Sequence, residues 1–175
     1  MKRTLKTEAI VLRKRSLPNQ DVIVTLLTKE LGKINTIAKG IKKITSRRLP
    51  HTQTANLINT VIYKKAERFY LQQSNLISGF SEIKKNQEKV RILYIYLFAI
   101  ERLLPENQVE DLVYKLTRQF LIDLSAMRNS GESILTDYLN SLLTVLGYIK
   151  EKKSDLELNK AIEEIIHEKM PELRI

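Results

Sequence analysis

The sequence predicts an α+β chain in two parts, a five-stranded β-barrel in residues 1–80 followed by an all-α helical domain in residues 81–175. Up to about residue 80, apolar residues occur in short β-branched runs separated by turn signals, and beyond it they recur at helical spacings of three and four. The charge changes at the same place. The first 80 residues hold ten lysines and six arginines against four acids, whereas the rest holds fourteen basic and sixteen acidic residues. The barrel is therefore expected to be strongly cationic and the helical domain nearly neutral.

The predicted strands are five short runs bounded by Gly, Pro, Asn and Asp. They cover residues 8–15, 21–28, 33–39, 56–64 and 68–75. Gly32 is expected to close a tight turn between the second and third strands, and Gly40 to open the next loop with a positive φ. Five strands in about eighty residues suit a Greek-key barrel of the OB type, whose face and loops commonly bind single-stranded nucleic acid. An SH3-like barrel is the alternative.

Four helices are predicted in the second part. They cover residues 83–104, 107–127 and 132–147, and a last helix begins at Ser154. The first is apolar all round its second half, Tyr94 included, and should be the hub of the domain. The second is expected to bury Leu112. Pro105 ends the first helix, Gly147 follows the third, and Ser154 with Glu157 fits a capping box.

Composition argues against several classes of protein. The chain has no cysteine, so disulfides, cysteine nucleophiles and thiolate metal sites are ruled out. His51 and His167 fall in different domains, and there is no glycine-rich phosphate loop. We therefore expect neither an enzyme nor a bound metal or cofactor. The longest nearly uncharged stretch, residues 92–100, is too short to span a bilayer, and the N-terminus lacks the apolar run of a signal peptide. These features predict a soluble, cytoplasmic protein.

A basic loop is the clearest candidate binding feature. The stretch "AKGIKKITSRRLP", residues 38–50, has no acidic residue and carries Lys39, Lys42, Lys43, Arg47 and Arg48. Basic residues at the end of the first strand, Arg13, Lys14 and Arg15, extend the cationic surface. Such a run is either a solvated face or a surface for a polyanion, and the charge of the whole domain favours nucleic acid. We expect the loop cations to face solvent and to contribute little to folding.

Three aromatic residues raise a second possibility on the same domain. Tyr63, Phe69 and Tyr70 could stack on bases, although alternating aromatics on a barrel more often lie in the core.

The stretch "EAIVLRKRSLPNQDVIVTLLTKELGKINTIAKGIKKITSRRL" resembles the N-terminal segment of the bacterial RecO family. The points of likeness are a first strand ending in basic residues, Leu-Thr before a glycine turn, and "AKG" followed by a basic loop. In the second half, "YLNSLLTVLGY", residues 138–148, is similar to the family's stretch before its late helices. The resemblance implies an OB fold and a helical domain. It also implies a DNA-binding, nucleoid-associated mediator that anneals strands and loads recombinase, working with RecR and single-stranded-DNA-binding protein.

The chain departs from the family after Tyr148. "IKEKKSDLELNKAIEEIIHEKMPELRI" stands where the family often has a cysteine module, and the chain stops short of the usual length. It therefore looks like a short form without the module, and no zinc is expected.

The resemblance also implies a site on the helical domain for the acidic, apolar-tipped tail of single-stranded-DNA-binding protein. Such a peptide needs a hydrophobic pocket beside a cation. The candidate cations border the apolar faces of the first two helices and are Arg91, Arg102, Lys115, Arg118 and Arg128. Two other functions remain open: an OB-fold adaptor that contacts mainly proteins, and an RNA-binding translation or ribosome factor.

Overall fold

The computed structural model describes residues 3–42, 46, 48–128 and 132–171. The chain forms two compact units. The first comprises Met1–Gly79 together with Pro105–Tyr114, and the second comprises Phe80–Leu104 with Lys115–Ile175. From the sequence, all of residues 81–175 are predicted to form one helical domain. The structure instead groups the ten-residue segment from Pro105 to Tyr114 with the barrel.

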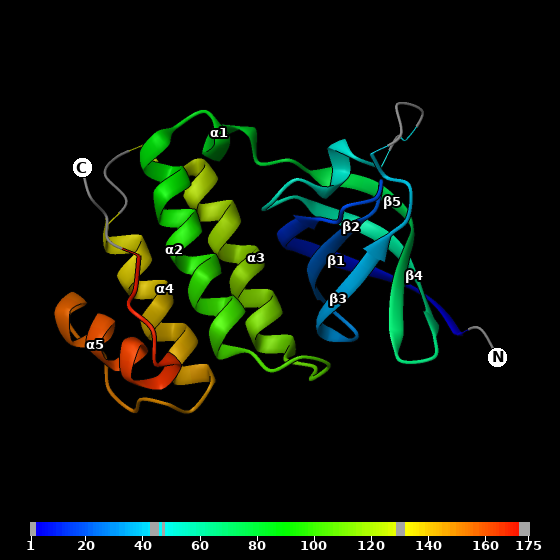
Figure 1. The fold of residues 1–175 in the computed structure, drawn as a ribbon. Helices are drawn as coiled ribbons and strands as arrows, with labels where there is room; N and C mark the ends of the chain where they lie inside the picture. The colour runs from blue at the N-terminus through cyan, green and yellow to red at the C-terminus, as the bar shows by residue number, and fades with distance from the viewer. Residues whose placement is uncertain (1–2, 43–45, 47, 129–131, 172–175) are drawn as a thin grey trace. The chain divides into compact units, whose positions relative to one another are not determined.

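The first unit is a closed five-stranded barrel (Figure 1). Its strands are β1 (Arg3–Ser16), β2 (Val22–Thr28), β3 (Gly32–Ala38), β4 (Leu57–Lys65) and β5 (Arg68–Ser78). They close in the order β1-β2-β3-β5-β4, with β1 pairing both β2 and β4, and all pairs are antiparallel except β3 with β5. A short 3-10 helix, Pro50–Thr52, lies between β3 and β4. This is the OB-type barrel that the sequence predicts.

The barrel is filled by side chains that alternate along the strands and by Ile41, which lies in the turn after β3. They form one buried cluster: Ala9, Val11, Val22, Val24, Leu26, Ile34, Ala38, Ile41, Ile58, Ile62 and Leu71. Phe69 packs against this cluster, as expected for a core aromatic. β1 begins five residues earlier than predicted, since Arg3 to Ile10 pair in register with Lys64 to Leu57 of β4. Both predicted glycine turns are confirmed, with φ of 68° at Gly32 and 60° at Gly40.

The segment after Pro105 joins the barrel because it pairs with a partly open strand. β3 pairs with β5 only at Thr36 with Phe69 and Ile37 with Tyr70, which leaves the first half of β3 without a paired strand from β5. Glu106 forms a parallel bridge to Lys33 there, and the amide of Asn107 donates to the Lys33 carbonyl at 2.8 Å. The phenol of Tyr114 donates to the Glu8 carboxylate at 2.5 Å. We call residues 105–108 the strap.

The strap explains why the second predicted helix starts late. Asn107 lies in a turn with a φ of 61°, residues 108–110 have no regular secondary structure, and α3 runs from Asp111 to Ala126. Leu112, predicted to be buried, lies in the first turn of α3 and is 63% exposed.

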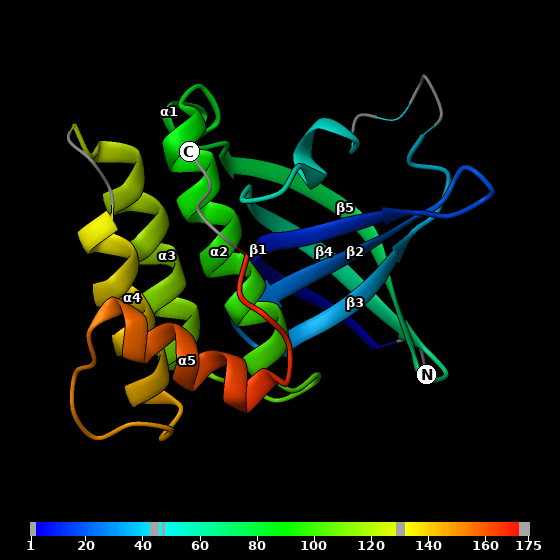
Figure 2. The same ribbon diagram turned by 60° about the vertical axis from the view of Figure 1, so that its left-hand side comes forward.

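The second unit contains the short α1 (Ser81–Lys84), α2 (Gln87–Leu103), the rest of α3, α4 (Glu132–Val145) and α5 (Asp155–Ile166) (Figure 2). The single predicted helix over 83–104 is thus two helices. The Asn86 side chain accepts a hydrogen bond from the Lys89 amide at 3.1 Å and so caps the N-terminus of a separate helix, α2. α2 buries nine of its 17 residues, as expected for the hub of the domain. Tyr94 faces away from its packed sides and is 56% exposed. The capping box of Ser154 and Glu157 is confirmed.

Candidate nucleic-acid interface

The first part of the basic loop is clamped to the turn between β1 and β2. The Asp21 carboxylate accepts the Gly40 amide at 2.7 Å, and the Lys42 amide donates to the Gln20 carbonyl at 3.2 Å. The Lys42 ammonium donates to the Leu17 carbonyl at 3.1 Å while the side chain stays exposed. Asp21 is one of four acids in the first 80 residues, and it serves here as an anchor. The two loops are therefore held together at one end of the barrel.

Arg48 closes the same loop from its other side. Its guanidinium donates to the Leu71 carbonyl at 2.8 Å and to the Lys39 carbonyl at 2.6 Å, and the side chain is half-buried. The sequence predicts that the loop cations face solvent and have little effect on folding. Arg48 differs from this expectation, because its half-buried guanidinium makes charge-assisted hydrogen bonds to main-chain carbonyls, and such bonds stabilise a fold. Lys43 and Arg47, also predicted to bind nucleic acid, lie outside the described residues.

A β-bulge decides which basic residues of β1 share a face. Val11 pairs with Leu26 and Arg13 with Thr25, so Leu12 is an extra residue on β1. Beyond the bulge, Arg15 pairs with Ile23 and Lys14 with Val24. Since paired residues project to the same side and Val24 lies in the core, Arg13 and Arg15 project to the outer face. Lys14 takes the opposite direction and is exposed at the barrel end.

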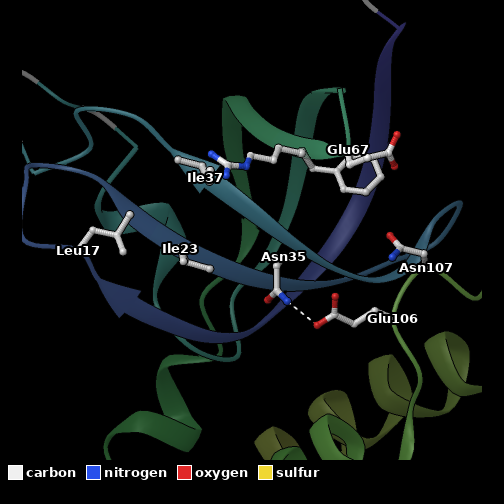
Figure 3. A pocket seen from close by; sticks show the side chains of 9 residues that line it. Leu17, Ile23, Asn35, Ile37, Glu67, Glu106 and Asn107 are labelled. Carbon is white, nitrogen blue, oxygen red and sulfur yellow. Dashed lines mark hydrogen bonds between the residues drawn. The ribbon is translucent and has the colours of Figure 1, made fainter. Parts of the chain in front are cut away.

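A pocket of about 430 Å³ lies on this outer face (Figure 3). Its lining combines the β1–β2 turn, β2, β3, the β4–β5 turn and the strap: Leu17, Ile23, Asn35, Ile37, Glu67, Arg68, Phe69, Glu106 and Asn107. OB folds bind oligonucleotides on this part of the barrel, between these two turns. The aliphatic side chains make an apolar floor, and Arg15 lies next to Ile23 on the neighbouring strand.

Asn35 gives the pocket a fixed polar wall. The Thr25 hydroxyl donates to Asn35 Oδ1 at 2.7 Å, which turns the amide nitrogen of Asn35 toward Glu106 Oε1 at 2.5 Å. The pocket thus offers carboxylate acceptors beside an apolar floor and a cation from Arg68. An unpaired base has flat faces that match the apolar floor and polar edges that can donate hydrogen bonds to the carboxylates.

The three candidate stacking aromatics divide between two positions. Phe69 packs on the core, whereas Tyr63 and Tyr70 project outward, since their chain neighbours Ile62 and Leu71 are core residues. His51 has a structural contact, with Nδ1 2.8 Å from the Ser74 carbonyl of β5.

The predicted partner-binding cations are spread over the second unit. Arg102 donates to Glu168 at 3.0 Å and lies 4.5 Å from the centre of the Phe98 ring. Arg91 is half-buried on α2, and Lys115 and Arg118 are exposed on α3. Arg128 lines a polar hollow of about 400 Å³ together with Met127, Lys85 and Lys89. The structure does not bring all five together.

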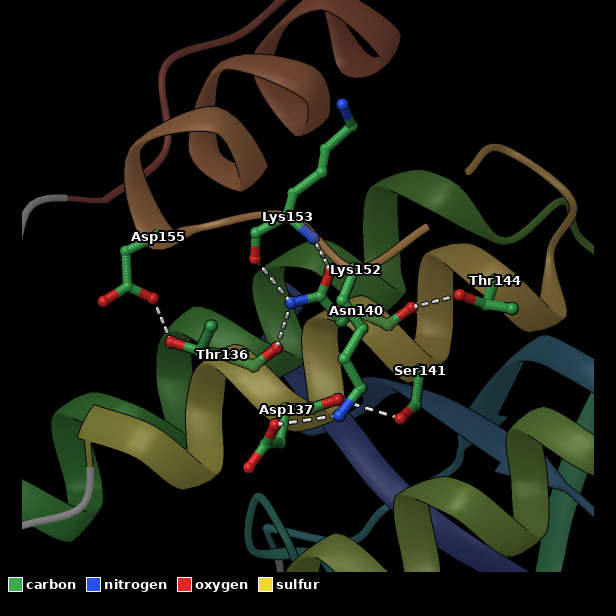
Figure 4. A network of polar contacts seen from close by, with 8 residues as sticks. All are labelled: Thr136, Asp137, Asn140, Ser141, Thr144, Lys152, Lys153 and Asp155. Carbon is green, nitrogen blue, oxygen red and sulfur yellow. Dashed lines mark hydrogen bonds and ion pairs between the residues drawn. The ribbon is translucent and has the colours of Figure 1, made fainter. Parts of the chain in front are cut away.

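Two buried polar residues of this unit were not singled out from the sequence. Lys89 is 9% exposed, and its ammonium donates to the Ser125 carbonyl at 2.9 Å. Asn140 is 2% exposed in the middle of α4 (Figure 4). Its amide donates to the Thr136 and Lys153 carbonyls, and its Oδ1 accepts the Lys153 amide at 2.8 Å. The signal for Asn140 was present, as one amide inside the leucine-rich run "YLNSLL".

The tyrosine of the same run lies in an aromatic cluster. Tyr138 contacts Tyr96 and Phe120 edge-on and donates its hydroxyl to Asp123. Burial, and then the bond to Asp123, raise the pKa of Tyr138 far above its usual value of 10.0. This phenol stays protonated at any physiological pH, and its half-buried ring packs beside Tyr96 and Phe120.

Within the described ranges, no three His, Cys, Asp or Glu side chains are grouped so as to hold a metal ion. Over the same ranges, no helix is both long and apolar enough to cross a membrane.

Comparison with known proteins agrees with the barrel and extends beyond it. Residues 1–80 match the family model described as recombination protein O N terminal. The DNA repair protein RecO of Caldanaerobacter subterraneus subsp. tengcongensis is 31% identical over 147 residues, which are 84% of this chain and 60% of the relative. RecO of a Thermoanaerobacter species is 30% identical over 149 residues, 85% of this chain and 60% of the relative. RecO of Heliobacterium modesticaldum is 30% identical over 164 residues, 92% and 58% respectively.

The chain thus spans about 60% of the length of the curated relatives that it matches. Residues 1–80 are thus similar to the N-terminal domains of RecO proteins, and most of the chain is similar to the DNA repair proteins RecO.

Proposed function

We propose that this chain binds DNA as a recombination mediator, promoting strand annealing and the loading of recombinase onto single strands coated with single-stranded-DNA-binding protein. The observation that carries the proposal is the shared outer face of Arg13, Arg15 and the pocket, beside the clamped basic loop. Cations on one face can neutralise phosphates of two strands and let them approach, while base pairing supplies the free energy of annealing. No covalent chemistry is needed, so we propose that the protein is not an enzyme.

The nucleic-acid contacts that we propose are the cations named from the sequence: Arg13, Lys14, Arg15, Lys39, Lys42, Lys43, Arg47 and Arg48. Arg13 and Arg15 are best supported, because they share a face with a pocket that can receive a base.

A titration of labelled single-stranded DNA, duplex DNA and RNA at several salt concentrations tests the function. The mediator proposal predicts binding to single-stranded DNA that weakens steeply with salt, together with faster annealing of complementary strands. Absence of DNA binding at low salt would leave the adaptor role. Clear preference for RNA would support a translation or ribosome factor instead.

We further propose that the second unit binds RecR or the tail of single-stranded-DNA-binding protein. One face of α2 supports a site for the tail: Arg91, Tyr94, Phe98 and Arg102 recur at helical spacing, with aromatic rings between two guanidinium groups. An acidic peptide with an apolar tip matches this pattern. Arg91→Ala is expected to weaken binding of the tail peptide to the full chain, whereas Lys160→Ala, an exposed cation of α5, is not. Equal effects of the two would point to non-specific attraction.

A further inference from the structure

Tyr63 and Tyr70 form a stacked pair on the outside of the barrel. They face each other across β4 and β5, with ring centres 4.9 Å apart and ring planes 12° from parallel. Both side chains are half-buried. Their chain neighbours Ile62 and Leu71 fill the barrel, so neither tyrosine is part of the core. We call this pair the tyrosine shelf.

Cations border the shelf on both sides. The Lys39 ammonium lies 5.2 Å from the centre of the Tyr70 ring. On the other side, β1 places Thr4 opposite Tyr63 and Lys6 opposite Val61, and both β1 residues are exposed. Thr4 is small, which leaves the side of Tyr63 remote from Tyr70 next to a short side chain. The acid nearest in sequence, Glu67, is paired with Lys64 at 3.3 Å.

The shelf lies beyond the pocket on the same outer surface. Ile23 pairs with Ile37, Ile37 with Tyr70, and Tyr70 with Tyr63, so an apolar row crosses β2, β3, β5 and β4 in turn. Arg15 stands at the β1 end of this row, opposite Ile23.

We propose that the tyrosine shelf is a stacking platform for the unpaired bases of a single strand, with Lys39 and Lys6 placed to meet its phosphates. The inference rests on the proposed DNA binding and deepens it. Bases stack on aromatic rings with little dependence on sequence, and a cationic groove holds the backbone. In a duplex the base faces are covered by neighbouring pairs, so the shelf selects single strands over duplex.

A stacked cross-strand pair also stabilises a sheet, so the test needs readouts separate from stability. We would compare the full chain with Tyr63→Leu/Tyr70→Leu and Tyr63→Phe/Tyr70→Phe, using oligothymidylate of roughly fifteen nucleotides and a duplex of equal length. Tyr148→Leu, an exposed tyrosine after α4, is the matched control. The Leu variant is expected to lose about tenfold or more in affinity for the single strand and little for the duplex. The Phe variant and the control are expected to bind like the unmodified chain.

Fluorescence supplies the second readout. The chain has seven tyrosines and no tryptophan, so its emission reports tyrosine directly. The single strand is expected to quench this emission in the unmodified chain, and to quench it much less in the Phe variant at equal occupancy. This holds even if the Leu variant fails to fold.

The inference is overturned if the folded Leu variant keeps its affinity for the single strand, or if its affinities for the single strand and the duplex fall equally. Undiminished quenching in the Phe variant overturns it as well. In these outcomes the unmodified chain still binds DNA in a salt-dependent way and the proposed function stands. If the unmodified chain binds neither probe at low salt, the proposed function fails with it.

Discussion

At the scale of single residues, Arg48 and Lys39 are neighbouring cations with different physical roles. The Arg48 guanidinium donates to the carbonyls of Leu71 and Lys39, whereas the Lys39 ammonium is exposed over Tyr70. Arg48→Ala removes the guanidinium donor from two main-chain carbonyls and should lower the free energy of unfolding by about 1–3 kcal/mol. Lys39→Ala should change it by less than about 1 kcal/mol. Both should weaken DNA binding. Urea unfolding and DNA titration of the two variants check this, and equal losses of stability would contradict a stabilising role for the Arg48 hydrogen bonds.

Asn140 is a second residue whose role follows from its hydrogen bonds. It connects α4 to the main chain of Lys153, just before α5. Asn140→Ala removes these bonds from half-buried main-chain groups, and should lower the unfolding free energy by about 2–3 kcal/mol. Asn159→Ala, at an exposed position of α5, should stay within about 0.5 kcal/mol. Denaturant unfolding of both variants is the measurement, and a neutral Asn140→Ala would mean that water replaces the amide.

At the scale of elements, the close approach of the strap to β3 can be tested with two glycines. Gly32 and Gly147 both have positive φ, 68° and 79°. A Cβ on Gly32 would lie 1.7 Å from the Gln108 carbonyl oxygen, but a Cβ on Gly147 would meet nothing within 4 Å. Gly147→Ala should therefore show only the conformational cost, about 1 kcal/mol.

Gly32→Ala carries the same conformational cost and must also displace the strap. It should be less stable than Gly147→Ala by at least about 2 kcal/mol in the free energy of unfolding. Thermal or denaturant unfolding of the pair measures the difference. If the two variants lose the same stability, the strap does not lie against β3 as described.

At the scale of the whole molecule, the charge asymmetry predicts where DNA binding is sensitive to salt. Arg13→Ala/Arg15→Ala removes two cations from the outer face of the barrel. The negative slope of log affinity against log salt should become shallower by about two. Lys150→Ala/Lys160→Ala changes the net charge equally, but on exposed positions of the helical unit, and should leave the slope nearly unchanged. Affinities measured at four or five salt concentrations decide this. Equal changes in slope would mean that net charge alone governs binding.

Some of the protein follows from local sequence pattern. β-branched runs with turn residues predict five strands, and three-to-four spacing predicts the longer helices, because both patterns depend on residues close together in the chain. The turn at Gly32 and the capping box at Ser154 are local for the same reason. The location of the positive charge is a property of composition and needs no structure.

What the tertiary structure alone decided depends on strand pairing and on contacts between different elements. The bulge at Leu12 shifts the alternation of β1, so that Arg13 and Arg15 share the pocket's face and Lys14 does not. Arg48 finds its acceptor 23 residues away, and Glu106 reaches Asn35 across 71 residues. Tyr63 and Tyr70 stack because the register of β4 and β5 sets them opposite each other. Periodicity reports which face of an element is apolar, but register, bulges and long-range hydrogen bonds arise only when the strands pair. The sequence by itself therefore determined the barrel, the helices and the cationic half of the chain, whereas strand pairing chose which cations and aromatics stand together.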